Sequence, residues 1–63
     1  MYKTVSELRA ATGWTQQKFA DYFGVTRVSV CKWEAGERKI TPALFDLMIY
    51  KLTREKIITP PEP

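Results

Sequence analysis

The chain has 63 residues, a single cysteine, no histidine and a formal net charge of +3. A chain of this length forms one domain and buries only about 60% of its unfolded surface, which leaves little room for a substrate cleft. One cysteine without a histidine excludes an internal disulfide, a zinc site and Cys–His catalysis, so we expect no metal or other cofactor.

The basic excess permits a nucleic-acid partner without requiring one. No apolar run approaches the ~18 residues of a membrane span, so no membrane partner is expected. The first residues lack the features of a secretory signal, which favours the cytoplasm.

Capping residues divide the chain into helices, taken here in chain order. Thr4 and Glu7 form a capping box at the start of the first, and Gly13 suits the left-handed position after its end. Thr15 begins a second helix, which Gly24 ends.

Thr26 begins a third helix that ends at Gly36, and the pair Thr41-Pro42 begins a fourth that runs to about Thr53. Residues 54–58 leave three possibilities open: a frayed extension, a short fifth helix, or a strand that pairs with a partner chain. The pattern predicts an all-α bundle of four to five helices over residues 1–58, followed by a proline-rich tail over residues 59–63.

Only residues 24–26 separate the second helix from the third. So short a connection forces the two helices to cross steeply, as in a helix-turn-helix, although any small helical bundle with one short corner would also show it. At 3.6 residues per turn, Val30 and Trp33 face the core. The outward face then carries Arg27, Val28, Cys31, Lys32 and Ala35.

That outward face has no acidic residue between Arg27 and Lys32, whereas a merely solvated helix more often alternates charges. Its small side chains suit the major groove of DNA, where Arg27 can reach guanine and Val28 a thymine methyl group. Cys31 is interpreted as a small groove-facing or partly buried residue, with redox sensing as the alternative.

Residues 5–52 resemble the Cro/CI-type (XRE-like) helix-turn-helix family of phage and bacterial repressors, which implies a λ-repressor-like fold. With Gln16 as the first motif residue, Ala20 and Gly24 stand at the required fifth and ninth positions. The apolar positions of the motif hold Phe19, Phe23, Val25, Val30 and Trp33, and the segment WEAGERK (33–39) resembles the end of the family's third helix. Arg9 falls where such repressors carry an arginine that pairs with the acidic residue matching Glu34, so a structural ion pair is expected.

The resemblance implies double-stranded DNA as the partner. Arg27, Val28 and Lys32 would read base edges, with Val28 standing where many relatives carry a polar reader. Contacts to the DNA backbone or bases are assigned to Thr26, Ser29, Gln16, Gln17, Arg38 and Lys39, since helix N-termini also attract phosphates. The four last-named side chains have the simpler interpretation of solvent-facing residues.

The fourth predicted helix is apolar over most of its circumference, with Asp46 and Thr53 as its polar strip. The surplus apolar surface could pack on the first helix. We favour self-association, because proteins that bind palindromic sites do so as twofold-symmetric dimers. The candidate interface residues are Phe45, Ile49, Tyr50, Ile57 and Ile58.

These observations predict a sequence-specific DNA-binding transcriptional regulator, a repressor that binds a palindromic operator as a homodimer with the helix over 26–35 in the major groove. A bacterial or phage-encoded protein at the nucleoid is expected. The same motif resembles antitoxin-type regulators, so a toxin protein is an alternative partner, although only ten residues follow Thr53 to wrap it. An enzyme is rejected because the chain has no histidine, no glycine-rich phosphate loop and no carboxylate pair set in a pocket.

Overall fold

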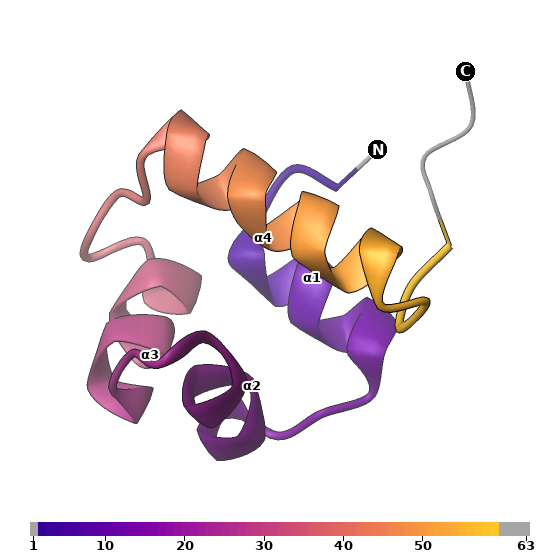
Figure 1. The fold of residues 1–63 in the computed structure, drawn as a ribbon. Helices are drawn as coiled ribbons and strands as arrows, with labels where there is room; N and C mark the ends of the chain where they lie inside the picture. Colours follow the sequence, from indigo (N-terminus) through magenta and orange to yellow (C-terminus); the bar gives the residue numbers. More distant parts are fainter. Residues whose placement is uncertain (1, 60–63) are drawn as a thin grey trace.

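The computed structural model describes residues 2–59, and within that range the chain forms four α-helices and no strand (Figure 1). The helices are α1 (Val5–Thr12), α2 (Gln16–Phe23), α3 (Arg27–Ala35) and α4 (Pro42–Arg54). The all-α prediction is confirmed, with four helices. Of the predicted proline-rich tail, only Thr59 belongs to the described residues.

Each helix begins after a threonine whose hydroxyl oxygen accepts a hydrogen bond from the backbone three residues later. The four capping residues are Thr4, Thr15, Thr26 and Thr41. Such a cap satisfies one of the N–H groups that a helix start leaves unpaired. The threonines thereby fix where α2 and α3 begin.

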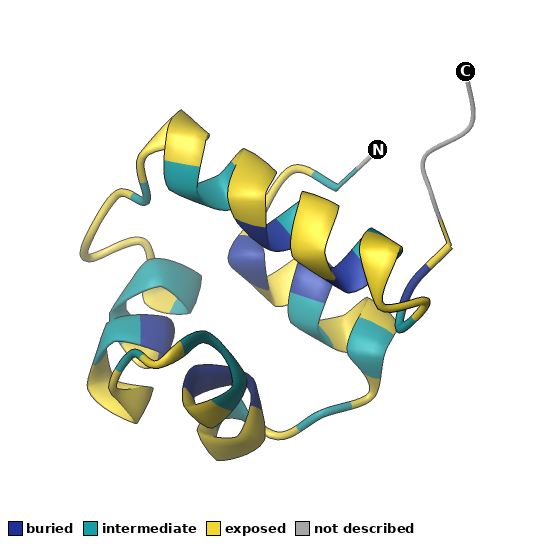
Figure 2. Cartoon of the chain, in the orientation of Figure 1, coloured by how far each residue is buried: buried dark blue, intermediate teal, exposed yellow. Residues whose placement is uncertain are grey.

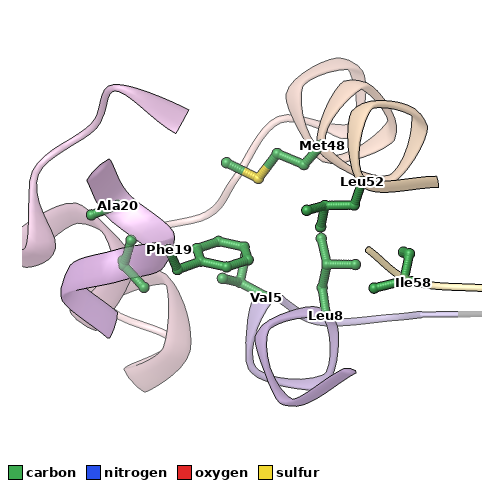
Figure 3. Packing of buried hydrophobic residues seen from close by; sticks show 8 residues of the cluster. Val5, Leu8, Phe19, Ala20, Met48, Leu52 and Ile58 are labelled. Atoms are coloured by element: carbon green, nitrogen blue, oxygen red, sulfur yellow. The ribbon is translucent and has the colours of Figure 1, made fainter. Parts of the chain in front are cut away.

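The core is built from buried side chains of all four helices and of the segment after α4. Its members are Val5, Leu8, Phe19, Ala20, Val30, Met48, Leu52 and Ile58. Figure 3 shows Leu8 of α1 and Leu52 of α4 pointing toward each other, while Phe19 of α2 points toward Val5. The core therefore joins α4 and α1 on one side to α2 and α3 on the other.

Residues 55–59 form neither a fifth helix nor a strand. Lys56 takes a positive φ of 61°, and the N–H groups of Ile57 and Ile58 donate to the carbonyl of Leu52 at 2.9 and 3.4 Å. This turn folds Ile58 back into the core, where it is 6% exposed. The prediction that Ile58 lies at a dimer interface is therefore wrong, because its side chain is buried within its own chain.

Within residues 2–59, none of the helices combines the length and the apolarity that crossing a bilayer requires.

Candidate nucleic-acid interface

The connection between α2 and α3 is a tight turn centred on Gly24. Gly24 has a φ of 70°, and its N–H donates to the carbonyl of Asp21 at 3.3 Å. The next N–H, that of Val25, donates to the carbonyl of Ala20 at 3.0 Å. Glycine adopts this left-handed conformation without the steric cost of a side chain. The turn lets only three residues separate the end of α2 from the start of α3.

The side chains of α3 divide between the core and the surface. Val30 is completely buried and Trp33 is half-buried, whereas Arg27, Cys31 and Ala35 are exposed. Val28 is 55% exposed, which is unusual for a large hydrophobic residue in this molecule. The exposed set matches the outward face expected from helical spacing, so the structure leaves Arg27 and Val28 free to meet a partner.

Lys32 differs from that expectation because it is half-buried. The chain turns back at the end of α3, where the N–H groups of Glu37 and Arg38 donate to the carbonyl of Lys32 at 2.9 and 3.3 Å. A lysine stem can lie along such a surface while its ammonium group remains in water.

The loop also brings Arg38 to the first turn of α3. The guanidinium of Arg38 donates to the hydroxyl of Ser29 at 3.1 Å, and the hydroxyl of Thr26 donates to the same oxygen at 3.1 Å. A helix start already carries unpaired N–H groups and positive potential. Hydroxyls, a guanidinium and a helix N-terminus at one place form an arrangement of donors that suits a phosphate group.

The two glutamines at the start of α2 behave differently. The side-chain amide of Gln16 donates to Glu34 at 3.0 Å and is half-buried, whereas that of Gln17 donates to Asp21 at 2.8 Å on the surface. The Gln16 side chain is thus engaged within the chain. Its backbone N–H, at the first position of α2, lies among the groups that a helix start leaves without an intrahelical partner.

The structure brings Arg9 and Glu34 together. The Nε atom of Arg9 bonds one carboxylate oxygen of Glu34, Nη2 donates to the other at 3.2 Å, and Nη1 donates to the carbonyl of Trp14 at 2.9 Å. The hydrogen bond from Arg9 is the main reason that the pKa of Glu34 lies below its ordinary value, with a further contribution from Gln16 against the opposing effect of burial. The same bond raises the pKa of Arg9. The pair ties α1 to the end of α3.

Two contacts of this surface were not expected from the sequence. The side chain of Gln16, which the sequence assigned to DNA contacts, donates to Glu34 of the Arg9–Glu34 pair, and Lys3 lines an open hollow that it shares with Arg38 and Lys39 beside the end of α3. Neither contact has a local signal in the sequence, because each depends on how separate elements pack against one another. The hollow adds a third cation to the two expected in the loop.

Of the residues expected at a dimer interface, Tyr50 alone has a highly exposed side chain, at 59%. Phe45, Ile49 and Ile57 are half-buried and pack against the core of their own chain. Leu47 was not among the expected residues, yet it is 60% exposed. The outward apolar surface of α4 is thus narrower than the sequence suggested.

Comparison with known proteins adds one match. A protein-family model described as helix-turn-helix matches residues 5–49, which is more than half of the chain. No curated protein and no solved structure matches the chain. The matched segment contains α1, α2, the turn at Gly24, α3 and the first part of α4. The chain therefore belongs to the Cro/CI-type (XRE-like) helix-turn-helix family of DNA-binding transcriptional regulators.

Proposed function

We propose that this protein is a repressor that binds a palindromic operator as a homodimer, with α3 of each copy in the major groove. The observation that carries the proposal is the outward face of α3, where Arg27 and Val28 are exposed and no acidic residue stands between Arg27 and Lys32, while Val30 anchors the helix to the core. Occupying a promoter in this way would block polymerase.

Arg27 is the proposed main reader of sequence. It lies at the first turn of α3, the end of a recognition helix that contacts base edges. Its planar guanidinium matches the O6 and N7 acceptors of guanine. Val28, exposed beside it, fits the methyl group of thymine. Lys32 is half-buried, and its flexible stem is proposed to reach a base or a phosphate at the edge of the contact.

Phosphate contacts are proposed on both sides of α3. On one side lie the hydroxyls of Thr26 and Ser29 with the guanidinium of Arg38, and Lys39 adds a charge close by. On the other side, the start of α2 offers the backbone N–H groups of Gln16 and Gln17. These contacts would set the register of α3 without reading sequence.

The test compares three alanine variants on an operator obtained by selection from random DNA and on scrambled DNA. Arg27→Ala is expected to lose about 1–3 kcal/mol of binding free energy on the operator and to relax the preference at one base pair. The reason is that contacts to bases distinguish one sequence from another, whereas contacts to phosphates do not. If Lys32 serves a phosphate, Lys32→Ala is expected to weaken both DNAs alike and to lower the salt slope by about one unit.

The matched control is Lys56→Ala, which removes one exposed charge beyond the end of α4. Figure 1 shows that this end of α4 lies across the molecule from α3. The control is expected to leave operator preference intact. Equal losses for Arg27→Ala and Lys56→Ala, on both DNAs, would contradict the proposed role of α3.

A further inference from the structure

The surface of α4 that faces away from the core is the second place, after α3, where large hydrophobic side chains are exposed. Leu47 and Tyr50 are 60% and 59% exposed, while Met48 and Leu52 on the opposite side of the helix are buried. Figure 2 shows this division along α4, with buried residues toward α1 and exposed ones away from it. Leu47 and Tyr50 are three residues apart, so their exposed side chains adjoin on one side of the helix.

Two opposite charges flank Tyr50 at equal spacing along the helix. Asp46 precedes Tyr50 by four residues and Arg54 follows it by four. At 1.5 Å per residue, each lies about 6 Å from Tyr50 along the axis, and i, i+4 spacing keeps all three on one side of the helix. All three are exposed.

Neither charge is neutralised within the described part of the chain. Among residues 2–59, the one ion pair is Arg9–Glu34. Arg54 donates to the hydroxyl of Tyr50 at 3.2 Å, which holds its guanidinium over this surface. Lys51, the other cation nearby, lies 4.7 Å from the ring centre of Tyr22 and so packs against its own chain.

This arrangement is complementary to itself in one orientation. If a second α4 runs antiparallel across the first, with the twofold axis at the level of Tyr50, Asp46 of each copy comes to the level of Arg54 of the other. A parallel pairing in register would bring Asp46 beside Asp46 and Arg54 beside Arg54 instead. A twofold-symmetric contact requires one patch that complements itself, and this patch does.

We propose that two copies of this chain associate through antiparallel α4 helices, with Leu47 and Tyr50 in the contact and Asp46 of each copy paired with Arg54 of the other. The inference rests on the proposed homodimer and names the surface that forms it. One short helix with two large exposed apolar side chains buries less than the ~1,200 Å² of a standard stable interface, so the dimer is weak in solution. Two adjacent half-sites on DNA raise its effective concentration and promote it.

Charge reversal tests the pairing. Asp46→Arg places two cations on the surface, and Arg54→Asp places two anions on it. Each variant alone is expected to dimerise at least about tenfold more weakly than the unmodified chain, because like charges then face each other. An equimolar mixture of the two variants brings opposite charges together at both ends of the contact, so a heterodimer is expected to form. The double variant Asp46→Arg/Arg54→Asp is expected to regain self-association.

The measurement is sedimentation equilibrium up to millimolar protein, with circular dichroism to verify folding, and Lys56→Glu as a charge reversal outside the contact surface. Single variants that dimerise like the unmodified chain, or a mixture that fails to associate, would overturn the α4 pairing. If the unmodified chain still dimerises in that case, the proposed homodimer forms through another surface. An unmodified chain that stays monomeric in solution and also on operator DNA overturns both proposals.

Discussion

Glu34 shows how much of this small fold depends on individual polar residues. Its carboxylate accepts two hydrogen bonds from Arg9 of α1 and one from Gln16 at the start of α2. The side chain of Glu34 is 11% exposed and that of Arg9 is 26% exposed. A charge removed from water to this extent is stable only with its partner present. One carboxylate therefore links three helices.

Replacing Arg9 by methionine should expose the cost of separating this pair. Methionine keeps the apolar stem but leaves the Glu34 carboxylate without its cation, and we expect a loss of up to about 3 kcal/mol in the free energy of unfolding. Urea denaturation of Arg9→Met beside Lys56→Met, which removes an exposed cation, measures the difference. Equal midpoints for the two variants would show that the pair contributes nothing.

The same pair predicts how stability responds to acid. Because Arg9 holds the pKa of Glu34 below its ordinary value, the stabilisation is complete above about pH 4.3, the value for an unfolded glutamate, and is lost as pH falls through the lower folded pKa. The unmodified chain should therefore exceed Glu34→Gln in stability at neutral pH, and the gap should close in acid. Urea denaturation from pH 7 to 3 gives the comparison, with Glu37→Gln in the exposed loop as the control. A gap that stays constant over this range would contradict the assignment.

Among the elements, the turn at Gly24 offers the cleanest test of backbone conformation. Its φ is 70°, and a side-chain carbon added there would meet nothing within 4 Å. The cost of Gly24→Ala is thus confined to the left-handed backbone, about 1–2 kcal/mol of unfolding free energy, and Gly24→Asn should cost less because asparagine tolerates this conformation. Thermal unfolding of both variants checks the order. A more stable alanine variant would contradict the left-handed turn.

The boundaries of the elements could be predicted from the sequence because they depend on neighbours. A threonine cap acts on the residue three positions later, and Gly24 acts on the turn that contains it. The bonds from Gln16 to Glu34 and from Arg38 to Ser29 could not be predicted, since they require the packed positions of separate elements.

The prediction that Ile58 lies at a dimer interface was wrong for a related reason. Ile58 reaches the core because Lys56 adopts a positive φ. Lysine seldom adopts this conformation, so no local sequence pattern predicts the turn.

For the whole molecule, the segment after α4 completes the core. Ile58 is 6% exposed, and Figure 3 places it beside Leu8 and Leu52. Within residues 2–59, only eight hydrophobic residues are buried. In a core this small, each large side chain carries a sizeable share of the burial that offsets the entropy of folding.

Shortening the side chain of Ile58 should therefore destabilise the entire domain. Ile58→Ala is expected to cost about 2–5 kcal/mol, which is comparable with the whole stability of a small domain, through lost burial and the cavity left behind. Ile57→Ala is the matched control, since Ile57 is half-buried, and should cost less. Circular dichroism during heating ranks the two. The opposite ranking would show that Ile58 does not seal the core.

The buried and the exposed residues of α3 are different residues, which affects how the DNA preference of such a regulator can change in evolution. The side chain that anchors the helix, Val30, is separate from the exposed Arg27 and Val28. Substitutions at 27 and 28 are therefore expected to be nearly neutral for folding, and under the proposed function each would change which operator is preferred. After gene duplication, a few such changes would lead each of two copies to bind its own operator and no longer that of the other copy, without a loss of folding stability.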